Sequence, residues 1–306
     1  MTEPLGRRVC AVVVTYNRSA LLRECLDAVL AQTHPIDVLV FDNASTDDTP
    51  DVLAEYAGRV RVTRLTKNSG GAGGFHAGMV QALMTDADWF WLMDDDTIAR
   101  PDCVEQLLAA ADRCPLPVDV LASRVEWIDG RRHPMNSGAV DARHDKAEAA
   151  AAAGCVAMRY ASFVSVMVPR RAVLDHGLPL ADYFIWGDDV EYTMRLTRQG
   201  LGLLVPQSVA VHKTAYFSLD TPGARYYFHV RNSFWTIRFS PAVRGERLGQ
   251  LARHVKEMAK LQARHQPWVV RRAALRGLRD GLGTRPDLTP LERMASANPG
   301  ALRTTA

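Results

Sequence analysis

The chain has 306 residues, 47% of them hydrophobic and 23% charged, with a formal net charge of +3 at pH 7. This is ordinary globular composition, and the length suffices to bury a substantial core in one large domain or in one domain with an appendage. No apolar stretch approaches the ~20 residues that span a bilayer, and the apolar run at 10–14 is too short for a signal peptide.

The cysteines and the distribution of charge indicate the compartment and the partners of the protein. The five cysteines are scattered without a CxxC pair, which predicts a reduced cytosolic protein without a zinc site or a disulfide framework. Residues 223–306 contain 16 Lys and Arg against 5 Asp and Glu, a net +11, whereas residues 1–222 contain 21 against 29, a net −8. This segregation predicts a compact body followed by a basic segment with an anionic partner.

The first half of the chain alternates between strand and helix patterns. Apolar runs predict strands at 9–14, 38–41, 60–65, 89–93 and 118–122. Helices are predicted over 21–30, in a short segment that Thr46 or Asp47 caps with Pro50 in its first turn, near 77–83 behind a glycine-rich turn, and over 101–113. Such alternation implies an α/β fold with a parallel sheet and right-handed crossovers.

The pattern loosens after residue 123. Residues 124–145 suggest a loop or hairpin region, and the alanine-rich tract 148–153 has no assignable role. Strands are predicted at 156–168, 203–205 and 209–212, and a helix at 188–199 that Gly200 closes. From residue 225 onward the chain is helical and basic, and 285–306 is expected to be loosely ordered.

The most informative segment is Trp89-Phe-Trp-Leu-Met-Asp94-Asp95-Asp96, a buried strand that ends in three consecutive carboxylates. Three adjacent acids repel one another strongly unless a positive charge sits among them. Ligands of open α/β sheets bind at the carboxyl ends of the strands, so the natural counter-charge is a hard divalent cation held to a substrate's phosphates. A helix N-cap at Asp96 would explain only one of the three acids.

Two polar turns follow the first two strands. Thr15-Tyr16-Asn17-Arg18 leads from a strand into a helix, where the turn N–H groups and the charge of Arg18 favour an anion. Asp42-Asn43 repeats the arrangement one unit later, and an Asp there is well placed to accept from a ribose hydroxyl or a base N–H. Each turn alone is a common capping pattern, but two such turns beside the triple Asp are harder to explain as caps.

A glycine-rich segment, Asn68-Ser-Gly70-Gly71-Ala-Gly73-Gly74-Phe75, follows the third strand. Its glycines let the backbone approach a bulky ligand closely or adopt positive φ. It lacks the Lys-Ser/Thr ending of a P-loop and the spacing of a dinucleotide fingerprint. Two interpretations remain open: a flexible turn that packs tightly on the sheet, or one wall of a nucleotide-sugar pocket.

A second acidic cluster, Trp186-Gly187-Asp188-Asp189-Val-Glu191-Tyr192, opens the helix predicted at 188–199. Asp188 and Glu191 can share a helical face with Arg195, whereas Asp189 and Glu191 cannot share one. One of the acids could cap the helix while another acts as a general base. Trp186 offers a flat apolar face for a sugar ring.

A histidine, His212, ends the strand predicted at 209–212. A lone histidine at a strand end is more often structural than a ligand. Beside a carboxylate site, however, an imidazole suits a Mn²⁺-type ion, so His212 is a candidate third ligand.

The basic segment combines cations with aromatic residues. It begins at Arg225-Tyr-Tyr-Phe-His229 and includes Trp268-Val-Val-Arg271-Arg272. Basic amphipathic helices with aromatic residues suit an anionic membrane surface, where each cation contributes ~1 kcal/mol. The alternative is a solvated helical face. Because no recognised nucleic-acid motif accompanies the charge, no nucleic-acid partner is expected.

Taken in order, these elements resemble the GT-A fold of the family 2 inverting glycosyltransferases. The matched pieces are 15–18, Asp42-Asn43, the DXD-type 94–96, 186–189 and His212, and they span about the first 215 residues. The segments 68–75 and 186–192 are similar to those of bacterial galactofuranosyl- and rhamnosyltransferases. The size and the basic helical end most resemble the actinobacterial galactofuranosyltransferases that begin the galactan of the cell wall.

The resemblance implies an architecture. A Rossmann-like, mostly parallel sheet flanked by helices would form a catalytic domain over 1–222. Residues 223–284 would be a basic helical segment associated with the membrane and the acceptor, and 285–306 a loosely ordered tail. Localisation would be cytoplasmic, peripheral on the inner face of the plasma membrane.

The resemblance also implies a role for each matched residue. The donor-binding residues would be Thr15, Tyr16, Asn17, Arg18, Asp42, Asn68, Gly70, Gly71, Asp94 and Asp95. The ligands of a divalent Mn²⁺ or Mg²⁺ ion would be Asp96, His212 and Asp94. The catalytic residues would be Asp189, as the base, and Asp188, and the acceptor-binding residues Trp186, Gly187 and Glu191. The family often carries Glu-Asp where this chain has Asp188-Asp189, so the choice of Asp189 follows the family pattern.

The implied reaction moves galactofuranose from UDP-galactofuranose to a rhamnosyl-GlcNAc-diphospho-polyprenol acceptor in cell-wall galactan (arabinogalactan) synthesis. Asp189 would take the proton of the acceptor hydroxyl in a single inverting displacement. A rhamnosyltransferase that uses dTDP-rhamnose is the alternative within the family. Outside it stand a nucleotidyltransferase, which would usually carry a Gly-x-Gly-Thr-Arg-type loop after the first strand, and a non-catalytic carbohydrate- or membrane-binding module. The sequence does not indicate an oligomeric state.

Overall fold

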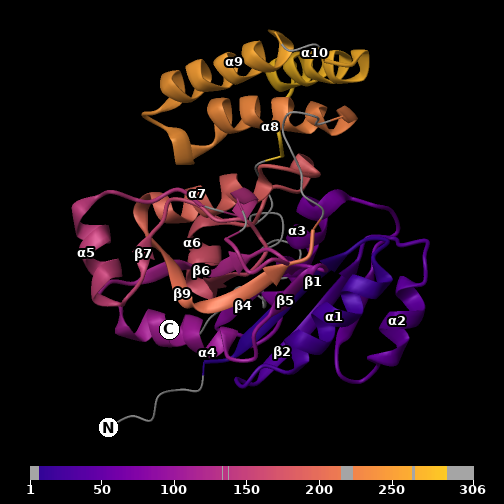
Figure 1. Ribbon diagram of the computed structural model, residues 1–306, viewed down its shortest axis with the longest axis vertical. Helices are drawn as coiled ribbons and strands as arrows, with labels where there is room; N and C mark the ends of the chain where they lie inside the picture. The colour runs from indigo at the N-terminus through magenta and orange to yellow at the C-terminus, as the bar shows by residue number, and fades with distance from the viewer. Residues whose placement is uncertain (1–6, 133, 137, 215–222, 264–265, 288–306) are drawn as a thin grey trace.

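A mixed β-sheet flanked by helices forms the body of the protein, and three further helices form a layer above it (Figure 1). The computed structural model describes residues 7–132, 134–136, 138–214, 223–263 and 266–287. The strands in these ranges are β1 (Val9–Thr15), β2 (Ile36–Asp42), β3 (Arg61–Arg64), β4 (Trp89–Asp94), β5 (Thr97–Ala99), β6 (Val118–Glu126), β7 (Val156–Ala157), β8 (Val166–Pro169) and β9 (Leu201–His212).

The helices of the described ranges comprise long α-helices and short 3₁₀ turns. The α-helices are α1 (Ser19–Leu30), α2 (Thr49–Glu55), α3 (Gly70–Ala82), α4 (Cys103–Arg113), α5 (His144–Ala152), α6 (Arg170–His176), α7 (Asp188–Gln199), α8 (Tyr226–Phe239), α9 (Arg247–Ala263) and α10 (Trp268–Gly283). The 3₁₀ turns are η1 (Pro134–Asn136), η2 (Ala181–Tyr183), η3 (Gly223–Arg225) and η4 (Pro241–Val243). None of the described helices combines the length and the apolar character needed to cross a bilayer.

The sheet has the strand order β3-β2-β1-β4-β8-β6-β9-β5, and β7 pairs with β9. β3, β2, β1 and β4 run parallel, so their carboxyl ends meet at one edge, where Thr15 lies opposite Asp42 and Val14 opposite Asp94. β8 runs antiparallel between β4 and β6, and β5 and β7 pair antiparallel with β9. The predicted α/β class is confirmed. Each antiparallel pair includes a strand that follows the triple Asp in the chain.

Both faces of the sheet are covered by helices. Alternate residues of a strand point to opposite faces, and in β1 the residues Ala11 and Val13 pack in the cluster formed with α1, α2, α4 and α5. Val12 and Val14 pack on the other side with α3, α6 and α7. Because both faces are covered, the carboxyl edge of the parallel strands is the place left for a ligand.

Helix α3 begins earlier than the sequence pattern predicts. The glycine-rich segment was expected as a turn ahead of a helix near 77–83, but α3 starts at Gly70 and those glycines form its first turns. The lack of side chains lets the helix approach β1 closely. A Cβ on Gly74 would lie 2.4 Å from Val14 Cγ1, and one on Gly78 would lie 2.3 Å from Val12 Cγ1. Tight packing on the sheet therefore explains Gly74 and Gly78.

The second half of the chain differs most from the predicted elements. The strands expected at 203–205 and 209–212 are one strand, β9, which shifts its register against β6 between Val205 and Val209. Only the two ends of 156–168 are strands, as β7 and β8. The alanine-rich tract belongs to α5, whose Ala149 and Ala150 are buried in the core. These segments are short or irregular. Too few of their residues follow a regular hydrophobic period for the sequence to predict their bounds.

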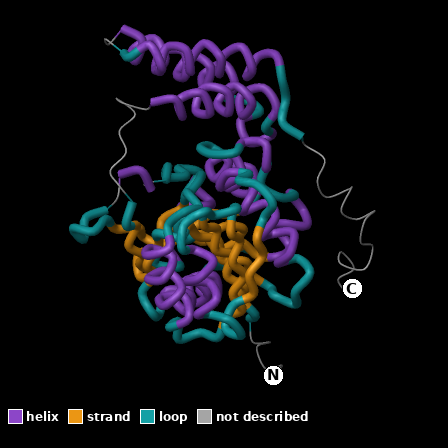
Figure 2. The backbone as a smooth tube through the Cα atoms, turned by 90° about the vertical axis from the view of Figure 1, so that its right-hand side faces the viewer, coloured by secondary structure: helices purple, strands orange, loops and turns teal. Residues whose placement is uncertain are grey.

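The helices α8, α9 and α10 form the upper layer, which Figure 2 shows above the strands. The layer has an apolar cluster of its own, to which Tyr226, Val230 and Phe234 of α8 contribute. Leu261 of α9 and Val270 of α10 complete its centre. The helical character predicted from residue 225 onward is confirmed by α8, α9 and α10, while residues 264–265 and residues 288–306 of the predicted tail lie outside the described part of the chain.

The first residue of α3 also joins two loops at the sheet edge. Gly70 has φ +74°, a backbone conformation that side-chain-bearing residues rarely adopt, and a Cβ there would lie 1.9 Å from the carbonyl oxygen of Phe184. The Ala72 N–H donates to that same oxygen at 3.1 Å. Helix α3 therefore rests directly on the loop that precedes α7.

We predict that Gly70→Ala lowers the free energy of unfolding by more than about 1 kcal/mol, because both the positive φ and the contact with Phe184 oppose a side chain. Gly71→Ala is the matched control: a Cβ there meets no atom within 4 Å, and alanine favours the helix by up to about 1 kcal/mol. Urea unfolding of both variants measures the difference. Equal effects of the two substitutions would contradict the assignment of Gly70 to this contact.

Candidate functional site

The candidate site lies at the edge where the parallel strands end. The register of β1, β2 and β4 brings Thr15, Asp42 and Asp94 to this edge. Asp95 and Asp96 form the turn from β4 into β5, directly beyond Asp94. The three consecutive carboxylates thus leave the buried strand at the point where a doubly wound sheet binds its ligands.

Asp95 is bound to the turn that follows β1. Its Oδ2 accepts hydrogen bonds from Thr15 Oγ1 at 2.7 Å and from the Tyr16 backbone N–H at 3.2 Å. Burial raises the pKa of Asp95 to about 6, because Arg18 and these hydrogen bonds compensate only in part. Thr15 and Asp95 therefore fix the turn to the strand end, and the Tyr16 side chain is left exposed.

Asp96 lies between two cationic or potentially cationic groups. Arg18 Nη1 pairs with Asp96 Oδ2 and lies 3.6 Å from Asp95 Oδ1, while His212 Nε2 lies 3.0 Å from Asp96 Oδ1. Burial by itself would raise the pKa of Asp96, but the contacts with His212 and Arg18 outweigh it and hold this pKa below its ordinary value. Asp96 is therefore the carboxylate of the three that stays ionised most readily.

His212 reaches Asp96 because of strand pairing. β5 pairs antiparallel with the end of β9, so Thr97 lies opposite His212, and the Lys213 N–H donates to the Asp96 carbonyl at 2.8 Å. The other ring nitrogen, Nδ1, lies 3.0 Å from Asn136 Oδ1. A proton on Nδ1 directed at Asn136 would leave Nε2 as the lone pair that faces the carboxylates.

Asp94 is the carboxyl of the three whose charged form is least stabilised. Burial, followed by the charges of Asp96 and Asp95, raises the pKa of Asp94 well above its ordinary value. Asp94, Asp96 and His212 offer ligand atoms that all lie within 4.8 Å of one another. Two carboxylates and one imidazole suit a Mn²⁺-type ion, and the carboxylates also suit Mg²⁺. The residues predicted as metal ligands are thus brought together by the fold.

The turn after β2 is built around Asp42. Asp42 Oδ1 accepts from the Ser45 N–H at 2.8 Å, and the Arg64 side chain lies 3.5 Å from Oδ2. Asp42 Oδ2 is buried and, within the described residues, accepts no hydrogen bond. Asn17 joins the first turn to the second, because its Oδ1 accepts from the Thr46 N–H at 2.7 Å. An acceptor oxygen at this depth is available to a ribose hydroxyl or a base N–H.

The predicted donor residues Asn68 and Gly70 lie beside these turns. Asn68 Oδ1 accepts from the Gly70 N–H at 2.8 Å, so its side chain caps the start of α3. Asn43 Nδ2 donates to the Gly70 carbonyl at 2.8 Å, and Asn43 Oδ1 accepts from Ser69. Gly71 has open space around its Cα hydrogens. The first turn of α3 is therefore held against the strand ends by Asn43.

The second acidic cluster opens α7. Gly187 is the N-cap residue with φ +88°, and Asp188 and Asp189 stand in the first helical turn. Burial raises the pKa of Asp189 to about 6, and burial together with Asp189 raises the pKa of Asp188 well above its ordinary value. The charge of Asp188 contributes to the raised pKa of Asp94, so Asp188 lies near enough to the strand-end carboxylates to act on them.

Glu191, predicted to contact the acceptor, lies apart from this site. It is buried in an ion pair with Arg195, with Glu191 Oε2 3.0 Å from Arg195 Nη2. Glu191 Oε1 also accepts from Ser240 Oγ at 2.7 Å. The (i, i+4) pairing of Glu191 with Arg195 is as the helical spacing predicts. The hydrogen bond from Ser240 connects α7 to the start of η4.

Two residues of α8, Arg231 and Asn232, hold the loop before α7. Asn232 Nδ2 lies 2.9 Å from the carbonyl oxygens of Tyr183 and Ile185 and 2.7 Å from that of Trp186. Arg231 Nη2 donates to the Tyr183 carbonyl at 3.0 Å as well as to that of Asp182. This role was not predicted, because both residues lie in the segment interpreted as membrane-facing. Their burial is the signal that separates them from the other polar residues of the segment.

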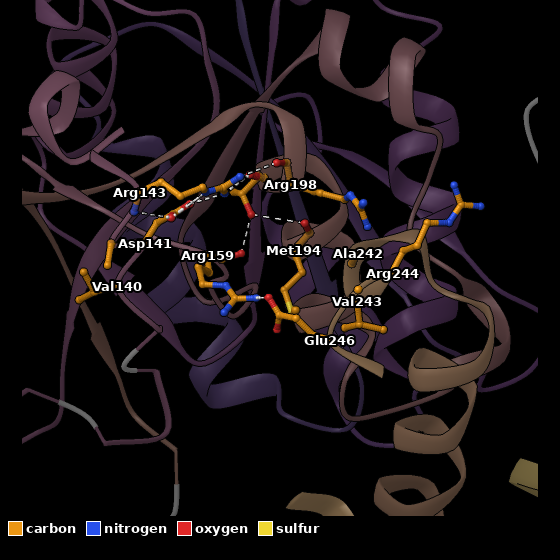
Figure 3. Close-up of a pocket in the computed structure, with 13 residues that line it drawn as sticks. Val140, Asp141, Arg143, Arg159, Met194, Arg198, Ala242, Val243, Arg244 and Glu246 are labelled. Atoms are coloured by element: carbon orange, nitrogen blue, oxygen red, sulfur yellow. Dashed lines mark hydrogen bonds and ion pairs between the residues drawn. The ribbon is translucent and has the colours of Figure 1, made fainter. Parts of the chain in front are cut away.

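A separate cavity of about 680 Å³ lies away from the strand-end site (Figure 3). It is bounded by the C-terminal half of α7, by 140–143 and by the segment 242–246. Arg143 pairs with Asp141 there, and Arg159 Nη2 lies 2.7 Å from Glu246 Oε1. The lining of this cavity includes none of the strand-end carboxylates.

Comparison with known proteins gives one matching family model and several relatives. A model described as glycosyl transferase family 2 matches residues 10–159. Galactofuranosyltransferase GlfT1 of Mycolicibacterium smegmatis is 36% identical over 205 residues, and that of Mycobacterium tuberculosis 36% over 200 residues. Both alignments cover 63% of this chain and 66% of the relative, so the match spans just under two thirds of the length of these relatives.

Solved structures with the same architecture are more distant in sequence. S. aureus TarS in complex with UDP-GlcNAc superposes with a TM-score of 0.61 at 16% identity, covering 94% of this chain and 83% of that one. The mannosyltransferase PcManGT from Pyrobaculum calidifontis, in complex with GDP-Man and Mn²⁺, gives a TM-score of 0.51 at 18% identity, with 96% and 79% covered. At these identities the likeness is one of fold.

We predict that Asn232→Ala lowers the free energy of unfolding by about 1–3 kcal/mol, because it strips a donor from the carbonyls of Tyr183, Ile185 and Trp186. Hydrogen exchange of the amides in 183–187 should accelerate at the same time. Ser233→Ala, at the neighbouring half-buried position, is the control and should change stability by no more than about 0.5 kcal/mol. If both variants unfold alike in urea and exchange alike, Asn232 does not hold this loop.

Proposed function

This chain belongs to glycosyl transferase family 2 and has the GT-A fold, and from that premise we propose that it transfers galactofuranose from UDP-galactofuranose. The proposed acceptor is a rhamnosyl-GlcNAc-diphospho-polyprenol, as in the synthesis of cell-wall galactan. The observation that carries the proposal is the cluster of Asp94, Asp96 and His212 at the strand ends, with Asp188 of α7 near enough to act on the charge of Asp94. The names of the mycobacterial relatives support galactofuranose as the sugar.

The proposed metal site consists of Asp96, His212 and Asp94. Their donor atoms lie close enough to share one ion, and an ion there would stabilise the charged form of Asp94. A bound Mn²⁺ or Mg²⁺ would supply positive charge to the diphosphate of the leaving group. The Mn²⁺ in the PcManGT complex supports this choice of ion. Arg18, now paired with Asp96, would be free to turn toward the diphosphate as a second positive charge.

The proposed donor site extends from Arg18 to the first turn of α3. Asp42, with its unsatisfied Oδ2, is assigned to the nucleoside, beside Thr15 and Asn17 of the first turn. Tyr16, Asn68, Gly70, Gly71 and Asp95 complete the proposed set of donor residues. UDP and UDP-GlcNAc in the TarS complexes support a uridine nucleotide, and dTDP-rhamnose is the alternative donor.

The proposed base is Asp189. A carboxylate with a pKa near 6 is largely ionised at neutral pH and is a stronger base than an ordinary aspartate. It would accept the proton of the acceptor hydroxyl as that oxygen attacks the anomeric carbon and the nucleoside diphosphate departs. Asp188 is more buried than Asp189 and its pKa is raised further, so it would stay protonated. A neutral Asp188 would place no second negative charge beside Asp189. Trp186 and Gly187 are assigned to the acceptor side, whereas the buried ion pair of Glu191 favours an indirect role there.

We infer a division of the chain into a catalytic domain over 1–222 and a basic helical segment over 223–284, with a tail over 285–306. The separate apolar cluster of α8, α9 and α10 supports this division. Several large apolar side chains of α9 and α10 are exposed, among them Leu248, Trp268 and Leu275. Exposed apolar groups among cations suit a membrane-bound acceptor, and hence a place at the inner face of the plasma membrane.

We predict that Asp189→Asn retains UDP-sugar binding but loses turnover by about 10²–10⁴-fold, because the amide cannot accept the proton. Transfer is measured with UDP-galactofuranose, dTDP-rhamnose and other nucleotide sugars, Mn²⁺ or Mg²⁺, and a short rhamnosyl-GlcNAc lipid acceptor, followed by linkage analysis. In the unmodified enzyme kcat/KM should rise with pH and level off above about 6, since the base is active when deprotonated.

The matched control is Asp182→Asn, an exposed acid in η2 of the same loop, which should transfer at the rate of the unmodified enzyme. Retention of most of the activity by Asp189→Asn would place the base elsewhere. Transfer from dTDP-rhamnose in place of UDP-galactofuranose would overturn the proposed donor while leaving the role of Asp189 intact.

We predict that the full chain co-sediments with anionic vesicles at low salt and is released at high salt, since exposed charges are screened. Trp268→Ala should weaken the association by about tenfold, the effect of removing one large apolar group from the interface. Met84→Ala, an exposed apolar residue at the end of α3, is the control and should leave the association unchanged. Absence of binding to anionic vesicles at low salt would contradict the proposed association of the basic segment with a membrane.

A further inference from the structure

A second group of metal-ligating side chains lies in the upper layer, between α8 and α9 and apart from the strand-end site. His229 stands on α8, and His254 and Glu257 stand on α9. We propose that these three side chains bind a divalent transition metal of the zinc class and thereby join α8 to α9. The absence of paired cysteines predicted a protein without a zinc site, but this set uses imidazole and carboxylate ligands only.

The geometry of the three side chains carries the proposal. His254 and Glu257 are three residues apart, so they project from the same face of α9. That face is turned to α8, where the ring of His229 lies 5.7 Å from that of His254, centroid to centroid. One ligand atom from each of the three residues lies within 4.8 Å of the others. Tetrahedral zinc ligands stand about 3.4 Å apart at the usual bond lengths, so small side-chain rotations close the site.

His254 supplies an independent observation. Its side chain is 5% exposed, and within the described residues its buried Nε2 makes no hydrogen bond. A buried imidazole nitrogen without a partner costs free energy, about 1–3 kcal/mol for a typical polar group. A metal ion at this nitrogen would remove that cost, and the edge contact of His254 with Phe234 would hold the ring in place.

The composition of the set also supports a metal. With Glu257 the set has the composition His₂Glu, which in zinc proteins leaves a fourth position to water or another ligand. Glu257 is exposed, so an ion can enter from solvent.

A metal bound by these three side chains would stabilise the packing of the helices in the upper layer. His229 precedes Arg231 and Asn232 on α8, the residues that hold the loop before α7. An ion shared with His254 and Glu257 would fix the position of α8 against α9. The site is therefore expected to be structural, and it does not depend on which sugar the protein transfers.

Calorimetric titration with Zn²⁺ tests the proposal in the full chain. All proteins carry His212→Gln and are kept in excess Mg²⁺, so that the strand-end carboxylates do not compete for Zn²⁺. The parent protein should bind one Zn²⁺ per chain and melt at a higher temperature with Zn²⁺ than in chelator. Loss of a second-sphere partner costs metal sites 10–100-fold in affinity, so His229→Gln and Glu257→Gln, which remove direct ligands, should each bind at least about tenfold more weakly.

The matched control is Glu148→Gln. Glu148 and His144 stand one turn apart on α5, with a carboxylate oxygen 4.0 Å from Nε2, but both are highly exposed, and no third ligand from the described part of the chain joins them. This variant should bind Zn²⁺ as the parent does. Because Glu257 is exposed, Glu257→Gln is expected to fold, and its melting temperature in chelator verifies this. Failure of the parent to bind Zn²⁺, or binding by Glu257→Gln and His229→Gln as tight as in the parent, would overturn the proposal.

Discussion

Three carboxylates at the sheet edge, Asp94, Asp95 and Asp96, are influenced by a fourth, Asp188 of α7, and the cost of ionising these groups together is the constraint on which the site depends. Asp95 is held by hydrogen bonds from the turn after β1, and Asp96 by Arg18. For Asp94 and Asp188, burial and the neighbouring carboxylates outweigh the groups that stabilise their charged forms, and both pKa values rise well above the ordinary value. A divalent cation placed among these carboxylates would stabilise their charged forms and lower their pKa values.

The upper layer completes the site and is more than an appendage. Arg231 and Asn232 of α8 hold the carbonyls of the loop that presents Asp188 and Asp189, while Gly70 of α3 packs against the same loop from below. The loop therefore lies between the donor side of the sheet and the basic helices. Such an arrangement couples the proposed catalytic base to the segment proposed to meet the membrane.

Much of the fold could be predicted because buried parallel strands and amphipathic helices have distinct periods. The triple Asp and His212 could be found because each ends a strand, although only the β5–β9 pairing shows that they meet. Arg231 and Asn232 could not, since their partners lie almost 50 residues away and are backbone carbonyls, which leave no mark in side-chain patterns. Glu191 shows the converse: its helical face was predicted, but its burial against Ser240 depends on packing alone.

The central claim is that the strand-end cluster binds a nucleoside diphosphate through a metal ion. Calorimetric titration with UDP tests this claim most directly. The account predicts tight binding of UDP in Mn²⁺, loss of most of this affinity in chelator, and the same loss in Mn²⁺ when Asp96→Asn removes one ligand. Asp189→Asn, which leaves the cluster untouched, should bind UDP in Mn²⁺ as the unmodified protein does. UDP binding that is equally tight in Mn²⁺ and in chelator would contradict the claim.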